Sequence, residues 1–198
     1  APVASISYAG SPYCNSGSTA DVTQTGSAGG AYSAVPTGLS IDQTTGLITL
    51  GTSMPGIYTV TYAIAAGGGC AAFSTTASVT ITAAPNATIS YAGSPYCSSG
   101  STVGVTRTGS PGGTYSTVPA GLAINATTGL ITLGTSTPGI YTVTYHIPAG
   151  GGCAAFNTTT SLTVTTGPSA TINYSDPPYC TSGGTANVTH SGSGSGTY

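Results

Sequence analysis

The chain consists of short runs in which apolar and polar residues alternate, and this period of two residues is that of a β-strand. Seven such runs occupy the first 85 residues, and Gly, Pro, Asn or Ser bound each of them: 4–8, 18–25, 30–35, 38–42, 46–50, 56–64 and 71–82. No segment of useful length has the period of an amphipathic helix. The pattern therefore predicts an all-β fold.

The sixth run, PGIYTVTYAI, shows the alternation most clearly. Tyr58, Val60 and Tyr62 fall on one face, and Thr59 and Thr61 fall on the other. A strand with one buried and one wet face is typical of an antiparallel sandwich. Seven short strands in about 80 residues is the immunoglobulin-like number. We expect an immunoglobulin-like β-sandwich.

Local features agree with this fold. Asp42, Thr45 and Gly46 are suited to a turn between the fourth and fifth runs. Tyr58 stands where a tyrosine corner would place it, with its hydroxyl bonding back to nearby backbone. The glycines at 67–69 are expected to form a hairpin loop rather than a phosphate cradle, because neither a helix nor a lysine follows them.

The pattern repeats with a period of 83 residues. The repeat is visible in two cysteine series, Cys14, Cys97 and Cys180, and Cys70 and Cys153. A period of this length with strand-like content indicates a tandem array of small domains. We expect one repeat at 1–85, a second at 86–168 and the start of a third at 169–198, arranged as a rod within a longer array. The third could not close a sandwich with two strands and the start of another.

Charge is nearly absent. Arg107 is the only basic residue, and Asp21, Asp42 and Asp176 are the only acids. Binding to nucleic acid or to an anionic membrane surface needs clustered Lys and Arg, so we expect neither partner. No apolar run approaches the ~20 residues that span a bilayer, so no membrane insertion is expected. The scarcity of acids also argues against calcium between domains.

Catalytic and metal-binding patterns are missing from the sequence. His146 and His190 are the only histidines, and the counterpart of His146 in the first repeat is Ala63. No C-x-x-C, H-x₃-H or G-x-S-x-G spacing occurs. We expect no enzyme activity, no metal and no cofactor. Arg107 replaces Gln24 of the first repeat and is expected to be solvated only.

Two motifs resemble a known family. GLSIDQTTGLITL followed by PGIYTVTY resembles the Ig-like and cadherin-like repeats of bacterial surface proteins. PYCSSGSTVGVT with AGGGCAAFNTTTSLTVT resembles repeats of giant Bacteroidota cell-surface adhesins of the SprB gliding-motility type. The resemblance covers nearly the whole chain. It implies a secreted, cell-surface, multi-domain filament that is exported by the type IX route and serves attachment or gliding.

The five cysteines fit an oxidising, extracellular compartment.

Two disulfide pairings are open. One closes each repeat on itself, Cys14 with Cys70 and Cys97 with Cys153. Strand parity favours a pairing between repeats. Cys14 lies in the first connection and Cys70 opens the seventh strand, and in seven alternating strands the first and sixth connections lie at opposite ends of a domain. Those ends are roughly 30 Å apart, whereas a disulfide needs Cα atoms within about 7 Å. Cys14 of one repeat would then meet Cys153 of the next.

In that interdomain scheme the remaining cysteines pair outside this sequence. Cys70 would serve a preceding repeat, Cys97 a following one and Cys180 a repeat further on. Such bonds would limit bending at each junction and stiffen the array. The neighbouring repeats of the same chain would be the principal partners.

Three functions fit these patterns. The first is the stalk of a cell-surface adhesin that carries weak, repeated contacts to a substratum or polysaccharide. The second is a passive extracellular fibre or sheath whose binding domains lie elsewhere, and the third is the stalk of an enzyme. Tyr13, Tyr96 and Tyr179 are the candidate ligand contacts, since they alone are expected to be semi-exposed aromatics. Packing beside the disulfide is the alternative role for them.

Overall fold

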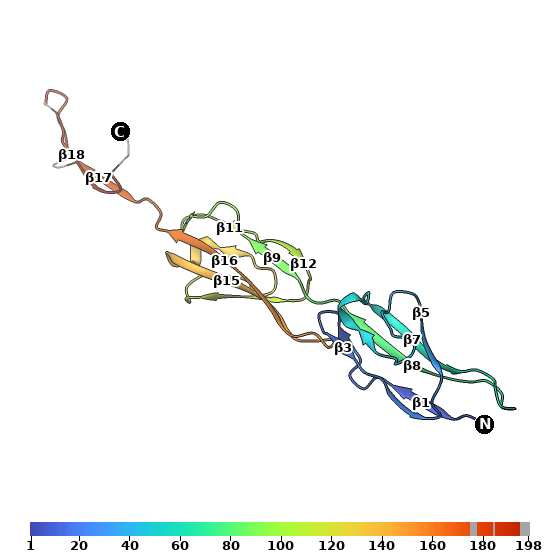
Figure 1. Cartoon of the computed structure of the whole chain (residues 1–198). Helices are drawn as coiled ribbons and strands as arrows, with labels where there is room; N and C mark the ends of the chain where they lie inside the picture. Colours follow the sequence, from blue (N-terminus) through green and yellow to red (C-terminus); the bar gives the residue numbers. More distant parts are fainter. Residues whose placement is uncertain (175–177, 184, 195–198) are drawn as a thin grey trace. The chain divides into compact units, whose positions relative to one another are not determined.

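The computed structural model describes residues 1–174, 178–183 and 185–194, so Asp176 and parts of the predicted third repeat lie outside it. Regular structure in this part of the chain is β-strand, apart from two 3₁₀ turns, Leu50–Thr52 (η1) and Leu133–Thr135 (η2). Figure 1 shows the element order. Within the described ranges, no helix has the length and apolar character needed to cross a membrane.

The first repeat is a two-layer sandwich. Its strands are β1 (Ala4–Ser7), β2 (Tyr13–Cys14), β3 (Thr19–Ala20), β4 (Thr23–Gly26), β5 (Ala31–Val35), β6 (Ile48–Thr49), β7 (Gly56–Ile64) and β8 (Phe73–Thr82). One layer is a four-stranded sheet in the order β2-β8-β7-β5, and the other contains the pairs β1-β4 and β3-β6. The fold is an immunoglobulin-like all-β sandwich.

The second repeat has the same strands in the same order. They are β9 (Ala87–Ser90), β10 (Tyr96–Cys97), β11 (Thr102–Val103), β12 (Thr106–Gly109), β13 (Thr114–Val118), β14 (Ile131–Thr132), β15 (Gly139–Ile147) and β16 (Phe156–Thr165). Its four-stranded sheet runs β10-β16-β15-β13. Each strand begins 83 residues after its counterpart.

The expected strands are confirmed with three corrections. The run 18–25 is split, because β3 pairs with β6 while β4 pairs with β1. The run 38–42 contributes a single bridge, Ile41 to Ile48, rather than a strand. The sequence prediction missed β2, which pairs in parallel with β8. Two residues are too few to show alternation, so this strand is visible only through its tertiary pairing.

The core follows the predicted alternation. Tyr58, Val60 and Tyr62 of β7 are buried, while Thr59 is exposed and Thr61 is half-buried. The buried cluster of the first repeat combines both layers: Ala4, Ile6, Tyr8, Ala20, Tyr32, Ile48, Leu50, Tyr58, Val60, Tyr62, Val79 and Ile81. Tyrosines supply the bulk of a core that lacks tryptophan.

The buried tyrosine hydroxyls are paired with backbone. Tyr58 donates to the Met54 carbonyl at 2.6 Å, which confirms the predicted corner. Tyr8 donates to the Gly46 carbonyl at 2.6 Å. The second repeat repeats the corner with Tyr141 and the Thr137 carbonyl at 2.6 Å. Each bond compensates the cost of burying a hydroxyl.

The predicted turn at Asp42 is also confirmed. Its carboxylate oxygen Oδ1 accepts the N–H groups of Thr44 at 2.8 Å and Thr45 at 2.7 Å. In the second repeat Asn125 accepts the equivalent two bonds, each at 2.9 Å. An acid and an amide therefore make the same turn, because both offer one side-chain oxygen to the following backbone.

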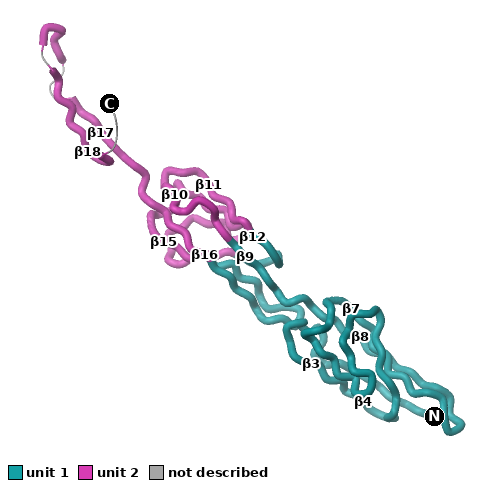
Figure 2. Tube along the Cα trace, turned by 45° about the horizontal axis from the view of Figure 1, so that its top comes forward, with its two compact units in different colours: residues 1–89, 107–114, 144–159 teal, residues 90–106, 115–143, 160–198 magenta. Residues whose placement is uncertain are grey.

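The chain divides into two compact units that do not follow the 83-residue period (Figure 2). The first contains Ala1–Ile89, Arg107–Thr114 and Thr144–Thr159, and the second contains Ser90–Thr106, Tyr115–Val143 and Thr160–Tyr198. The first unit thus holds the whole of the first repeat together with two parts of the predicted second repeat, Arg107–Thr114 and the end of the β15–β16 hairpin. The domain boundaries predicted from the sequence period stay a prediction.

The C-terminal segment forms a two-stranded antiparallel ladder of β17 (Ala170–Tyr174) and β18 (Val188–Gly192). Ile172 is 55% exposed and Tyr174 is 46% exposed, whereas their counterparts Ile89 and Tyr91 are buried. No second layer packs on either face of this ladder within the described residues, as expected for the start of a sandwich.

Candidate functional site: the Cys14–Cys153 junction

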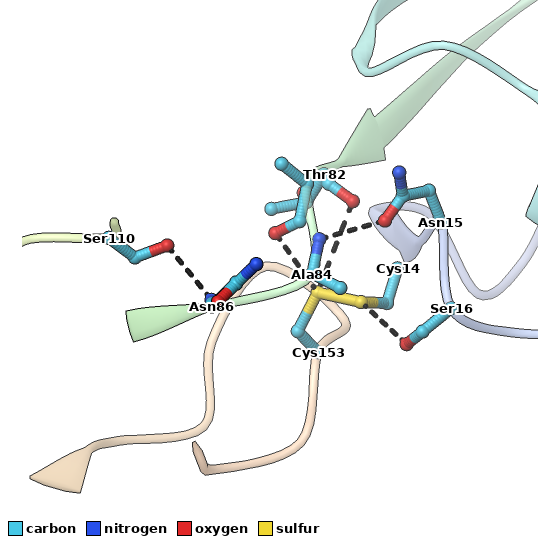
Figure 3. Close-up of a disulfide and its surroundings, with 9 residues drawn as sticks. Cys14, Asn15, Ser16, Thr82, Ala84, Asn86, Ser110 and Cys153 are labelled. Carbon is cyan, nitrogen blue, oxygen red and sulfur yellow. Dashed lines mark hydrogen bonds between the residues drawn. A yellow bond between two sulfur atoms is a disulfide. The ribbon is translucent and has the colours of Figure 1, made fainter. Parts of the chain in front are cut away.

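One side of the junction is the end of β2. Cys14 pairs with Thr82, the last residue of β8, so it lies where the chain leaves the first repeat. The Asn15 N–H donates to the Thr82 carbonyl at 2.9 Å, and the Asn15 side-chain oxygen accepts the Ala84 N–H at 2.8 Å (Figure 3). Asn15 therefore holds the departing chain next to Cys14.

The other side is the tip of the β15–β16 hairpin. Gly150 and Cys153 exchange two backbone hydrogen bonds, at 3.0 and 2.9 Å. Between them Gly151 and Gly152 have φ of 59° and 78°. Two central residues with positive φ make the tight turn whose twist matches that of the flanking strands, and glycine adopts it without strain. The turn fixes Cys153 at the point where the chain re-enters the hairpin.

A disulfide joins the two sides. Cys14 and Cys153 are bonded across 139 residues, with their Cα atoms 4.7 Å apart. Each cysteine is 7% exposed. This confirms the pairing that strand parity favours, and it leaves no partner role for Cys70 within its own repeat. The bond lies inside the first compact unit.

The sulfur atoms have polar neighbours. The Ser16 hydroxyl donates to Cys14 Sγ at 3.1 Å. Cys153 Sγ lies 3.6 Å from the Ala83 carbonyl oxygen. A bridged sulfur carries no proton, so this second approach is a packing contact. The bond therefore lies beside the Thr82–Ala84 segment that leads out of the first repeat (Figure 3).

The two turn glycines contribute a close approach that the sequence analysis missed. A Cβ on Gly152 would lie 2.1 Å from the Pro12 carbonyl oxygen, and one on Gly151 would lie 2.9 Å from the Thr82 side chain. Real Cβ atoms do not come this close to a carbonyl oxygen. The hairpin can therefore contact the first repeat only with glycine at these positions. The sequence interpretation considered only the equivalent glycines of the first repeat, at 67–69, and assigned them to a hairpin loop alone.

Three cysteines carry free thiols. Cys70 is exposed, Cys97 is half-buried and Cys180 is exposed. Cys97 Sγ lies 2.8 Å from the Ser99 hydroxyl, and hydrogen bonds from Ser99 lower the pKa of the Cys97 thiol below its usual value. Their pairing with neighbouring repeats stays a prediction.

The three candidate tyrosines have different surroundings. Tyr13 is half-buried against the core, and its hydroxyl accepts the Gly10 N–H at 3.0 Å. Tyr96 is half-buried, and its hydroxyl donates to the Ala92 carbonyl at 2.7 Å. Tyr179 is 51% exposed. Ligand contact by these tyrosines stays a prediction.

A shallow groove of about 590 Å³ lies on the first repeat. Gln24, Thr44 and Thr45 supply its polar lining, and Tyr32 and Tyr62 supply its aromatic lining. The two tyrosines are only 5% and 2% exposed. Their faces are consequently covered, and the groove has no aromatic platform on which a sugar ring could stack.

His146 and Arg107 both have structural partners. His146 Nδ1 lies 2.7 Å from the Asn157 side-chain oxygen on the neighbouring strand. The expectation for Arg107 is wrong. Its guanidinium donates to the carbonyls of Gly109 and Ser110 at 3.1 and 3.0 Å and lies 5.6 Å from the centre of the Tyr145 ring. Across the described ranges, no group of three His, Cys, Asp or Glu side chains could hold a metal ion.

Arg107 replaces an interaction of Gln24 rather than adding a charge to solvent. The Gln24 amide donates to the carbonyls of Thr25 and Ser27 at 3.3 and 3.0 Å. Ser27 is the counterpart of Ser110, whose carbonyl accepts from Arg107 in the second repeat. Both side chains therefore tie down the turn that follows their strand. The longer arginine adds the cation–π contact with Tyr145.

No protein-family model matches the chain, and no curated protein matches it in sequence. Solved structures of adhesion proteins resemble it. Protocadherin gamma B2 extracellular cadherin domains 3–6 are 12% identical, with a TM-score of 0.49 over 98% of this chain and 56% of that one. Mouse cadherin-23 EC22–24 is 17% identical, with a TM-score of 0.46 over 90% of this chain and 72% of that one.

Drosophila N-cadherin EC1–4 is 10% identical, with a TM-score of 0.45 over 79% of this chain. The chain spans about half the length of that fragment, 48%. A likeness at this level carries no argument about function.

Proposed function

We propose that this chain forms stalk repeats of a filamentous bacterial cell-surface adhesin, secreted to the cell exterior and used for attachment or gliding. The observation that carries the proposal is the buried Cys14–Cys153 bond between consecutive repeats. A disulfide within one repeat would support a thin core. A disulfide between repeats instead restrains their connection, which a stalk under load needs.

The physical basis is that two covalent links now cross the repeat boundary. One is the main chain through Ala83 and Ala84, and the other is the disulfide. A single short linker permits swivelling, whereas two separate links remove much of that freedom. The near absence of charge in the sequence leaves few acids for a calcium-bound junction, so the disulfide would take over the stiffening role.

Attachment would come from many weak contacts summed along the array. Substratum or polysaccharide would be the ligand, and exposed aromatic rings would be the contacts, with Tyr179 the most accessible candidate. The test is solid-phase binding of the purified chain to glass and to a panel of polysaccharides, comparing Tyr179→Ala with the unaltered protein. Binding that falls for Tyr179→Ala supports the adhesin. Absence of binding to every surface contradicts it.

A passive extracellular fibre or sheath is the second candidate. It is favoured by the intramolecular bonds of Tyr13 and Tyr96, whose hydroxyls tie down their own loops. A spacer needs such bonds and no ligand. If the chain binds none of the surfaces, this function replaces the first.

Stiffness is tested separately from binding. Small-angle scattering of the oxidised chain should give a narrower distribution of repeat orientations than scattering of the Cys14→Ser variant. Equal distributions would contradict the stiffening role. Labelled antibodies on live source cells then distinguish gliding from static attachment, because the label on a motility adhesin travels along the surface.

A further inference from the structure

We propose that the Cys14–Cys153 bond carries tension past residues 15–152, so that the chain cannot lengthen under load by unfolding them. A load that enters before Cys14 and leaves after Cys153 passes through the two sulfur atoms instead of the main chain between them. The inference deepens the proposed stalk function and rests on the same junction, but it needs no adhesive contact.

The covalent path through the junction is much shorter than the main chain. Cys14 and Cys153 are 139 residues apart in the sequence, whereas their Cα atoms are 4.7 Å apart. The disulfide therefore closes the main chain between them into a covalent loop. Tension applied outside a closed loop does not stretch it, because the bond at its base holds its two ends together.

Most of the folded structure lies inside this loop. The loop contains the strands from β3 to β15, whereas β1 precedes Cys14 and β16 follows Cys153. In the buried cluster of the first repeat, Ala4, Ile6 and Tyr8 precede Cys14, and the other members lie inside the loop. A load can therefore pull directly on β1 and β16 but not on the strands between them. Even if loss of β1 unfolds the rest of the repeat, the loop adds no length.

The loop withholds most of the length that unfolding could release. At about 3.3–3.6 Å per extended residue, its 139 residues correspond to roughly 460–500 Å. The segments 1–14 and 153–198 together extend to only about 200 Å. A Cys14–Cys70 bond would withhold roughly 190 Å. The withheld length therefore distinguishes a bond between repeats from a bond within one.

The load-bearing bond is shielded from dissolved thiols. Each of its cysteines is 7% exposed. The turn glycines Gly151 and Gly152 lie close to the Thr82 side chain and the Pro12 carbonyl beside the bond. Thiol–disulfide exchange requires a thiolate to reach one of the two sulfur atoms, so this packing slows reduction while the surrounding fold is intact. A bond that carries the load of a stalk needs such protection.

The sequence allows the path of the load to be tested with one protease. Arg107 is the only lysine or arginine of the chain, and trypsin cuts after these residues. Arg107→Gln removes the site and introduces the residue that the first repeat has at this position, Gln24. One new arginine then places the only cut. Ala28→Arg places it in the exposed β4–β5 connection inside the loop, and Thr166→Arg places it in the exposed segment after β16, outside the loop.

The test holds single full-length molecules at both ends under a steady load and adds trypsin. The tags lack lysine, arginine and cysteine, and the three free cysteines are changed to serine, so that only the Cys14–Cys153 bond can form. We expect the cut Ala28→Arg molecule to stay tethered until reductant is added, and the Thr166→Arg molecule to break without it.

The control carries Cys14→Ser together with Ala28→Arg and should break without reductant. Reducing gels of the digests show that both sites are cut. A cut Ala28→Arg molecule that breaks while oxidised overturns the proposal, because the load then ran through the main chain.

A second measurement gives the withheld length with the native cysteines. The fully stretched oxidised chain should be shorter than the Cys14→Ser, Cys153→Ser variant by roughly 460–500 Å. Cys70→Ser is the matched control and should be as short as the unaltered chain. Equal lengths of the unaltered chain and the double variant contradict the proposal, and so does a difference of roughly 190 Å. Surface binding is measured separately, so failure of adhesion and failure of the load path are distinguishable.

Discussion

Two hairpin tips have the same sequence and the same backbone turn, but the surroundings of their cysteines and glycines differ. The tip at 149–156 is bonded through Cys153, which is 7% exposed, and its glycines contact Pro12 and Thr82. The tip at 66–73 has an exposed Cys70 and glycines with open space around them. Both nonetheless have the same tight turn with positive φ.

The difference separates what local sequence determines from what a partner determines. The turn forms in both places because two glycines adopt positive φ without strain. Burial of the cysteine requires a β2-type surface opposite, and only one hairpin has one. The same local turn therefore accompanies a buried, bonded cysteine at one tip and an exposed thiol at the other.

The largest expected effect is loss of the junction bond. Cys14→Ser with Cys153→Ser, in a Cys97→Ser background that prevents intermolecular bonding, should destabilise the chain by about 5 kcal/mol for a loop of 139 residues on the chain-entropy model. The melting temperature should fall by ~10 °C or more. Calorimetry measures this, and Cys70→Ser in the same background is the control. Equal melting of both proteins would show that the junction contributes nothing to stability.

The next effect compares the two tips directly. Gly152→Ala and Gly69→Ala impose the same left-handed strain, but only Gly152 also faces the Pro12 carbonyl. Gly152→Ala should lower the free energy of unfolding by about 1–3 kcal/mol more than Gly69→Ala does, which is the usual cost of overpacking. Urea unfolding of both variants in the Cys97→Ser background gives the difference. Identical losses would mean that the bonded tip has no close contact with the first repeat.

A third effect compares the cores of the two repeats at high pH. Burial raises the pKa of Tyr8 and of Tyr91 above the ordinary value, and each hydroxyl donates at 2.6 Å to a backbone carbonyl. The unfolded tyrosine ionises near pH 10 while the folded one stays neutral, so stability is full below about pH 10 and falls as pH rises further.

Tyr8→Phe and Tyr91→Phe should each lower the free energy of unfolding by roughly 1 kcal/mol at neutral pH. Each should also make stability fall less steeply as the pH rises above about 10. Chemical unfolding from pH 8 to 11.5 measures both quantities. A decline that stays as steep in the variants would assign the alkaline sensitivity to other groups. A flattening in one variant alone would show that the two cores are not equivalent.

The smallest effect compares Asp42 with Asn125 at the same turn. Hydrogen bonds from the Thr45 and then the Thr44 backbone N–H lower the pKa of the Asp42 carboxyl. Its contribution is present above the unfolded pKa of about 3.9 and is lost as pH falls through the lower folded pKa. Asp42→Asn should behave as the native protein at pH 7 and retain more stability at pH 2–3. Superimposable unfolding curves at every pH would contradict this.

Much of the fold could be predicted because local sequence patterns determine it. Alternation identified the buried face of β7, and the position of Tyr58 identified its corner bond. Strand parity placed Cys14 and Cys153 together without any knowledge of the junction. These features depend on periodicity, which a single sequence shows.

The features that sequence analysis missed depend on tertiary pairing. β2 has two residues and pairs in parallel with a strand about 70 residues away, so it has no pattern of its own. Gly152 looks the same as Gly69 in sequence, and only the Pro12 carbonyl distinguishes them. Arg107 looked solvated because its partners are backbone carbonyls and the face of Tyr145, which no sequence motif marks.

The central claim is that the covalent link runs between repeats, and disulfide mapping tests it most directly. The oxidised chain is digested with pepsin at low pH, which prevents exchange, and the linked peptides are identified by mass spectrometry. The account predicts a peptide containing Cys14 bonded to one containing Cys153. A peptide joining Cys14 to Cys70 would contradict it and would make each repeat a self-contained, internally bridged domain.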